Sequence, residues 1–154
     1  MSLVAVILAK YLIYFLVAWV IVATLVIFPR PGIGPRLIWG LKILTSLILF
    51  AGVTWVLHQY FPSTRPYILD RLEPLLYLPT SYSFPSGHAG QAAIFASFIF
   101  SMSRPWGMLA FILAFLVGAG RVMVGAHFIQ DVLGGLIIGT VISVIVLKLG
   151  RKIK

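Results

Sequence analysis

Long apolar runs, separated by short polar segments, dominate the sequence. They cover residues 3–28, 37–60, 89–102, 106–120 and 128–149. A helix needs about 20 mostly apolar residues to cross the hydrocarbon core of a bilayer. We therefore predict an all-α, multispan transmembrane helix bundle with about five spanning helices.

Proline, glycine and basic residues occupy the segments between the runs. Residues 29–36 contain three prolines and are expected to break any helix, and residues 103–105 are expected to form a tight turn. Residues 61–85 form a longer loop rich in proline, tyrosine and serine. Because no sequence repeat or separate soluble part is visible, residues 1–154 are predicted to form a single integral-membrane domain.

Basic residues predict the orientation of the bundle. If each run crosses once, Arg30, Arg36 and Lys42 lie on the same side as Arg104 and the basic C-terminal tail. Lysine and arginine favour the cytoplasmic side of a membrane. The loop after residue 60 and the segment around residues 121–128 are then expected on the external or periplasmic face of the cell membrane, together with the N-terminus.

Composition excludes several classes of protein. Hydrophobic residues make up 61% of the chain and charged residues only 10%, against about 25% charged residues in soluble domains. The net charge of +9 does not indicate a nucleic-acid partner, because most charges lie at the ends of apolar runs. The chain has no cysteine for disulfides or metal binding, and its first run is too long for a cleavable signal peptide.

Residues 83–90, Ser-Phe-Pro-Ser-Gly-His-Ala-Gly, have the pattern of a helix start that binds an anion. Pro85 restricts the backbone, Ser86 is a good N-cap and Gly87 allows close approach. His88 then lies in the first turn, beside backbone amides that lack partners inside the helix and bind phosphate well. An ordinary helix cap at a membrane surface explains this stretch equally well when it is taken alone.

His127 and Asp131 are four residues apart, so they share one face of a helix. A carboxylate bonded to one ring nitrogen fixes the tautomer and leaves the other nitrogen free to attack. The alternative is a buried pair without chemistry, but ionisable residues in membrane proteins are costly and tend to be functional. Arg65 and Arg121 could each bind two phosphate oxygens at once. Alternatively, they could anchor the helices at the membrane interface.

Glycine and alanine at four-residue spacing predict close helix packing. The pairs are Ala114 with Gly118 and Gly135 with Gly139. Small residues at this spacing let neighbouring helices approach within a membrane. We assign these four residues no chemical role.

Three segments, in order, resemble the motifs of the type-2 phosphatidic acid phosphatase superfamily of integral-membrane lipid phosphate phosphatases. The motifs of that family are K-x6-R-P, P-S-G-H and S/G-R-x5-H-x3-D. The second is complete at residues 85–88, and the third is complete at residues 120–131. The first matches only at residues 65–66, because His58 stands at the position of the usual lysine.

The resemblance implies a two-step reaction without a metal or another cofactor. His127 would be the nucleophile that forms a phosphohistidine, and Asp131 would orient and activate it. His88 would protonate the leaving group and later activate water. The resemblance further implies side chains and amides that bind the transferring phosphoryl group, which are those of Arg65, Arg121, Ser86 and Gly87. We add the hypothesis that His58 contacts the phosphate while it is protonated.

The expected partner is a lipid phosphate substrate in the surrounding bilayer lipids. Undecaprenyl diphosphate is the first candidate by analogy with the family, and phosphatidylglycerol phosphate, phosphatidic acid and a lipid A phosphate remain open. A non-catalytic lipid-phosphate binding protein is an alternative that His58 favours and the intact motif residues oppose. A histidine-lined proton or ion channel fits poorly, because the ionisable groups gather at one face.

Overall fold

The computed structural model describes residues 3–24, 33–69 and 82–149, and all regular structure in these ranges is helical. This confirms the predicted all-helical fold. The elements, in chain order, are α1 (Leu3–Val6), the π-helix η1 (Ile7–Tyr11), α2 (Leu12–Val22), α3 (Ile33–Tyr60), α4 (Pro66–Leu69), α5 (Gly87–Met102), α6 (Arg104–Met123) and α7 (Ile129–Leu149).

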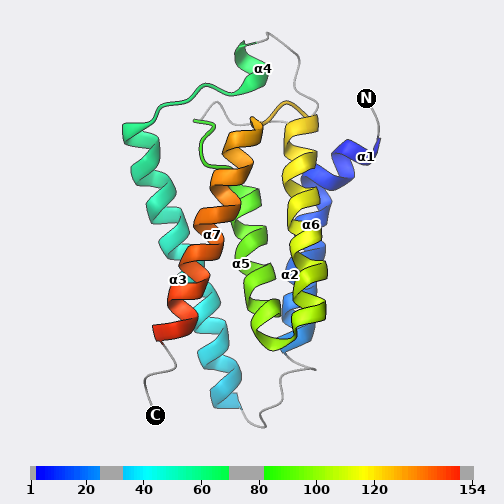
Figure 1. Cartoon of the computed structure of the whole chain (residues 1–154), viewed down its shortest axis with the longest axis vertical. Helices are drawn as coiled ribbons and strands as arrows, with labels where there is room; N and C mark the ends of the chain where they lie inside the picture. Colours follow the sequence, from blue (N-terminus) through cyan, green and yellow to red (C-terminus); the bar gives the residue numbers. More distant parts are fainter. Residues whose placement is uncertain (1–2, 25–32, 70–81, 150–154) are drawn as a thin grey trace.

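Helix α5 forms the centre of the bundle. It packs against α2, α3, α6 and α7, which run roughly alongside it (Figure 1). Ten of its sixteen residues are buried, among them Ile94 and Phe98, which are fully enclosed. Alanines at positions 92, 93 and 96 keep its surface narrow, so the surrounding helices can approach closely.

Four helical segments in the described ranges are long and apolar enough to cross a membrane. They are Leu3–Val22, Gly34–Tyr60, Arg104–Met123 and Ile129–Leu149. The remaining predicted span, α5, is only about 24 Å long at a rise of 1.5 Å per residue, which is shorter than a hydrocarbon core of about 30 Å. The neighbours of α5 cover it on most sides, so its length need not match the bilayer. The prediction of about five spans therefore becomes four long spans around one shorter, enclosed helix.

The outer surface of the bundle is strongly apolar. Leu37, Trp55 and Ile137 each expose about 60% or more of their surface, and many other large apolar side chains are similarly exposed. A soluble protein does not tolerate so large an apolar surface, whereas lipid tails cover it without cost. The chain is therefore a multi-pass membrane protein.

The start of α3 differs from the prediction. Residues 29–36 were expected to break any helix, yet α3 begins at Ile33 and includes Gly34, Pro35 and Arg36. The physical reason is that the first turn of a helix tolerates proline, because its amides have no partner inside the helix. Residues 25–32, which include the end of the first predicted run, lie outside the described residues.

Glycines on α7 hold this helix against the start of α5. A Cβ atom at Gly135 would lie 2.5 Å from the carbonyl oxygen of Ser86, and one at Gly139 would overlap the backbone of Gly90. Similarly, a Cβ atom at Gly118 would overlap the side chain of Val132. The predicted close packing at these glycines is confirmed, and it brings the N-terminal ends of α5 and α7 together.

Candidate active site

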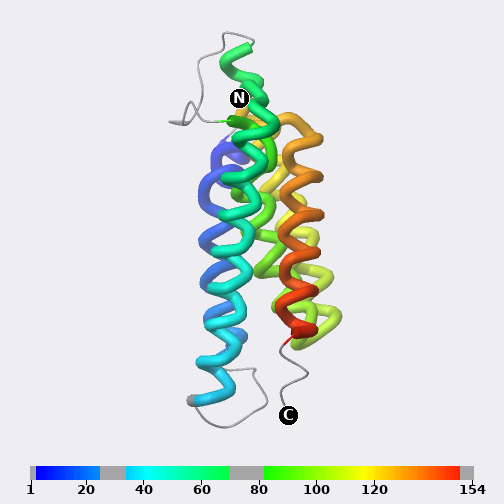
Figure 2. The backbone as a smooth tube through the Cα atoms, turned by 90° about the vertical axis from the view of Figure 1, so that its left-hand side faces the viewer, coloured from blue at the N-terminus to red at the C-terminus, as the bar shows by residue number. Residues whose placement is uncertain are grey.

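The three motif segments meet at one end of the bundle. They lie between α3 and α4, at the start of α5, and between α6 and α7 (Figures 1 and 2). Backbone hydrogen bonds tie the segments to one another. These bonds run from Ser83 N to Ser63 O (2.8 Å), from Tyr67 N to Gly125 O (3.2 Å) and from Ser86 N to Asp131 O (2.9 Å).

Asp131 is held rigidly in the first turn of α7. Its side chain is fully buried, and its Oδ2 accepts a hydrogen bond from the amide of Phe128 (2.8 Å), the residue just before the helix. This contact resembles the return bond of a capping box, in which the third helical residue satisfies the N-cap amide. The hydroxyl of Ser83 donates a second hydrogen bond to Oδ2. The carboxylate orientation is thus fixed by the start of its own helix and by the loop before α5.

The imidazole of His127 lies between Arg65 and the Ser83–Asp131 pair. Its Nε2 is 3.3 Å from Arg65 Nη1, and its Nδ1 is 3.4 Å from Ser83 Oγ and 3.7 Å from Asp131 Oδ2. Arginine can only donate hydrogen bonds, so the nitrogen that faces Arg65 must carry the lone pair. The tautomer assigned from these partners therefore has its proton on Nδ1 and leaves Nε2 able to attack.

The surroundings of His127 favour its neutral form. Burial lowers the pKa of this imidazole below its ordinary value, and the nearby charges of Arg65 and Arg121 lower it further, although Asp131 opposes them. Only 4% of the residue is exposed. A buried, neutral imidazole with a directed lone pair has the properties of a nucleophile.

A sharp turn brings His127 back towards the bundle. Gly125 adopts a φ of 72°, a left-handed conformation that glycine tolerates without strain. Next to it, the carbonyl of Ala126 accepts a hydrogen bond of 3.1 Å from Arg65 Nη1. The guanidinium of Arg65 is therefore anchored to the residue just before His127.

Arg121 is the second buried cation of this region. It lies at the end of α6, is 6% exposed, and donates from Nη1 to the carbonyl of Ala9 in η1 over 3.4 Å. Gly120 permits this contact, because a Cβ atom there would lie 2.6 Å from Ala9 N. Arg121, Arg65 and His88 lie within electrostatic range of one another. Two positive charges therefore act on the space near His88, as an anionic substrate requires.

Ser86 occupies the predicted N-cap position of α5, but its hydroxyl does not cap the helix. Ser86 Oγ is buried and has no hydrogen-bond partner, while the backbone amide of Ser86 bonds to Asp131. A Cβ atom at Gly87 would meet nothing within 4 Å, so open space lies beside this residue. The hydroxyl of Ser86 and the first amides of α5 are therefore the groups here that suit a bound anion.

His58 belongs to the first motif segment. It is near the end of α3, where its ring centroid is 5.6 Å from that of Tyr82 at an angle of 60°. Its Nε2 is buried without a hydrogen-bond partner, and it lies within electrostatic range of Arg65. The structure thus brings His58 to the same end of the bundle as the other predicted site residues and within electrostatic range of Arg65.

Sequence reasoning missed three contacts in this site. Ser83 belongs to residues 83–90, but the sequence pattern assigns it no role. The pattern likewise gives no role to the backbone carbonyls of Ala126 and Ala9. No local signal marks any of them, because each acts on a residue distant in sequence or through its backbone. Among the described residues, no group of three or more histidine, cysteine, aspartate or glutamate side chains could hold a metal ion.

The sequence profile of the PAP2 superfamily matches residues 39–154. The chain belongs to this superfamily. All three motifs lie within the matched region, so the resemblance that they indicated is confirmed. The first long span, which supplies the Ala9 carbonyl to Arg121, precedes the matched PAP2 region.

Individual PAP2 proteins resemble the chain at moderate identity. Phosphatidylglycerophosphatase B of Bacillus subtilis is 36% identical over 110 residues, which are 64% of this chain and 52% of that protein. The undecaprenyl-diphosphatase of Sulfolobus acidocaldarius is 33% identical over 101 residues, 59% of this chain and 49% of that protein. The chain spans about half the length of the curated relatives it matches.

A solved structure agrees with the fold over nearly the whole chain. The crystal structure of LpxE from Aquifex aeolicus matches with a TM-score of 0.74 and 25% sequence identity, covering 96% of this chain and 87% of that one. The arrangement of helices around α5 is therefore that of a PAP2 membrane protein.

Proposed function

We propose that this protein is a lipid phosphate phosphatase that works through a phosphohistidine on His127. The observation that carries the proposal is the orientation of the His127 ring. Its Nε2 carries a lone pair and faces Arg65, whereas its Nδ1 faces Ser83 and Asp131. Family membership and the names of the relatives support the same reaction class.

In the first step, His127 Nε2 attacks the phosphorus atom of the substrate. An N–P bond forms as the P–O bond to the lipid oxygen breaks, and His88 donates a proton to that oxygen. The imidazole gains positive charge, which the nearby Asp131 carboxylate stabilises. The charge on the phosphoryl oxygens is neutralised by fixed cations, as phosphoryl transfer requires.

In the second step, water attacks the phosphohistidine. His88, now neutral, accepts a proton from the water as the new P–O bond forms and the N–P bond breaks. Inorganic phosphate leaves, His127 returns to its neutral form, and His88 is protonated for the next cycle. His88 therefore donates one proton and accepts one in each cycle, and both histidines return to their starting states.

The phosphoryl group would be held by cations and by the start of α5. Arg65 and Arg121 suit this role because both are buried at the site end, 6% exposed each. Paired hydrogen bonds from a guanidinium match the geometry of phosphate oxygens. The hydroxyl of Ser86 and the amide of Gly87 would complete the binding site, and His58 would add a contact while protonated.

The substrate would present its phosphate at the membrane interface and keep its chains in the bilayer. Undecaprenyl diphosphate is our first candidate, supported by the relative named undecaprenyl-diphosphatase. The relative named phosphatidylglycerophosphatase B supports phosphatidylglycerol phosphate as the second candidate.

We further propose that the site faces the external or periplasmic side of the cell membrane, because basic residues such as Arg36, Lys42 and Arg104 belong to the opposite end.

Phosphate release from a panel of purified lipid phosphates tests the proposal. The wild-type protein in detergent should release phosphate from at least one member, and His127→Ala should release none. Gln130→Ala is a matched control, since Gln130 is an exposed neighbour without a proposed role. With substrate labelled in the transferred phosphate, wild-type protein quenched at alkaline pH should carry label on a histidine. Full activity in His127→Ala would overturn the mechanism.

A further inference from the structure

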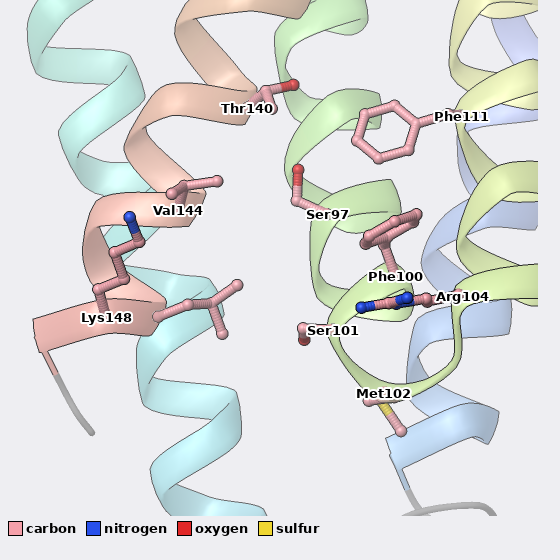
Figure 3. Close-up of a pocket in the computed structure, with 10 residues that line it drawn as sticks. Ser97, Phe100, Ser101, Met102, Arg104, Phe111, Thr140, Val144 and Lys148 are labelled. Carbon is pink, nitrogen blue, oxygen red and sulfur yellow. The ribbon is translucent and has the colours of Figure 1, made fainter.

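A cavity of about 600 Å³ opens at the end of the bundle opposite His127. It lies between the end of α5, the start of α6 and the end of α7 (Figure 3). Arg104 and Lys148 lie on opposite sides of it, and Phe111, Val144 and Thr140 form part of its wall (Figure 3). The volume is in the range of small-molecule binding sites, and the wall combines charge with apolar surface.

Among the residues that the structure describes, none places an acidic side chain beside the positive charge at this cavity. Neither Arg104 nor Lys148 forms an ion pair with any residue that the structure describes. The only acid in those ranges, Asp131, is at the other end of α7, about 25 Å from Lys148 along the helix axis. Two exposed cations beside an apolar cavity therefore suit an anionic ligand.

An apolar groove continues from the cavity towards the middle of the bundle. It has a volume of about 380 Å³, shares Phe111 and Thr140 with the cavity, and is further lined by Phe115, Ile137 and Val141. The hydroxyl of Thr140 is already bonded to the carbonyl of Leu136 (2.8 Å), which leaves this part of the wall effectively apolar. A cationic mouth that leads into an apolar groove matches the shape of a lipid with a charged headgroup.

We propose that this cavity binds one anionic phospholipid from the membrane leaflet at that end. Its phosphate would lie between Arg104 and Lys148, and one acyl chain would follow the groove past Phe111 and Thr140. A free anion would leave the apolar groove unused. A second copy of the chain is a poor occupant, because the described residues offer only one acid, the fully buried Asp131. The site would be separate from the catalytic end and independent of the proposed reaction.

Native mass spectrometry of the delipidated protein tests the charge requirement. Wild-type protein should bind phosphatidylglycerol more tightly than phosphatidylcholine with the same acyl chains. Arg104→Gln/Lys148→Gln should weaken phosphatidylglycerol binding about 30-fold, the loss expected from two cations near a lipid surface. The control Arg36→Gln/Lys42→Gln removes the same charge from the early part of α3 and should retain wild-type affinity. Equal losses in both double variants would overturn the proposal.

A second pair of variants tests the shape of the cavity. Val144→Trp should fill the cavity and weaken phosphatidylglycerol binding, whereas Ile145→Trp, at an exposed position outside the wall, should not. Competition by inorganic phosphate alone would identify a small-anion site, and a lipid-independent dimer cross-linked through position 144 would identify a protein interface. Either result would overturn the lipid proposal. Because the measurement is binding, His127→Ala should leave it unchanged, so failure here is distinct from failure of the phosphatase proposal.

Discussion

Ser83 Oγ donates a hydrogen bond to Asp131 Oδ2 and lies 3.4 Å from Nδ1 of His127. The carboxylate itself is 3.7 Å from that nitrogen, which is too long for a direct hydrogen bond. Ser83 is fully buried, so solvent does not compete for its hydroxyl. The hydroxyl therefore links the carboxylate to the imidazole and helps to fix the ring with Nε2 towards Arg65.

We expect Ser83→Ala to lower kcat roughly 10-fold with little change in KM. The variant removes a hydrogen bond to a buried carboxylate, a contact whose loss costs roughly 1.5–3 kcal/mol, but Phe128 N still holds the carboxylate. Ser83→Thr keeps the hydroxyl and should recover part of the rate. Ser101→Ala, which removes a hydroxyl bonded to the Phe98 carbonyl, is the control for loss of a serine. A purely structural role would lower the melting temperature in Ser83→Ala without this selective fall in kcat.

Several of these relationships were predictable from sequence, and others were not. The four-residue spacing of His127 and Asp131 predicted that both lie on one helix face. The structure does bring the two side chains together, but the helix part of the prediction was wrong, because α7 begins at Ile129 and His127 lies in the turn before it. The link through Ser83 was not visible, because Ser83 comes from a loop 48 residues earlier in the chain. The enclosure of α5 by its neighbours was similarly hidden, since an apolar run does not reveal whether lipid or protein covers it.

The acid limb of the pH–rate profile should have its midpoint below pH 6.5. His127 attacks only when neutral, so kcat/KM rises as pH increases through its pKa. Burial lowers this pKa below the ordinary value, so the imidazole should be fully available at pH 7. An unshifted imidazole would instead be about one-quarter protonated at that pH.

Nuclear magnetic resonance can assign this pKa directly. The chain has three histidines, so His58→Gln/His88→Gln leaves His127 as the only imidazole. Its ring resonances should titrate with a midpoint below 6.5. A midpoint at or above 6.5 would contradict the neutral nucleophile, whatever the kinetic profile shows.

Single-cysteine labelling should place the two ends of the bundle on opposite sides of the membrane. The natural chain has no cysteine, so each introduced thiol is unique. Phe61→Cys, at the catalytic end, should react with a membrane-impermeant reagent in intact cells. Leu149→Cys should react only after lysis. Both positions are exposed at the surface of the bundle, by 61% and 66%. Reaction of Leu149→Cys after lysis shows that its earlier lack of reaction reports sidedness and not burial. The reverse pattern would show that the site faces the cytoplasm.

The last prediction concerns His58, which stands where the family usually has lysine. Its ring packs against Tyr82, and its buried Nε2 has no hydrogen-bond partner in the structure. A buried nitrogen without a partner is costly unless a ligand satisfies it. We therefore expect this nitrogen to contact the substrate phosphate when the ring is protonated.

His58→Lys should retain activity and extend it to higher pH. Histidine has an ordinary pKa of about 6.5 and lysine of about 10.4, so lysine keeps its charge throughout the range in which histidine loses it. His88 must also be protonated to act as the acid, and it should become the limiting group on the alkaline side of the lysine variant. Gln59→Lys adds the same charge at the exposed neighbouring position and should not shift the alkaline limb.

His58→Ala completes the test, because it removes the proposed contact without replacing it. The loss of one hydrogen bond to a charged group corresponds to roughly 1.5–3 kcal/mol, so kcat/KM should fall by about 10-fold to 150-fold at acid pH, where the wild-type ring is protonated. The effect should shrink as pH rises, since wild-type His58 is then neutral and contributes less. A loss of equal size at every pH would mean that His58 only packs against Tyr82. Unchanged profiles in both His58→Ala and His58→Lys would leave Arg65 and Arg121 as the side-chain cations that hold the phosphate.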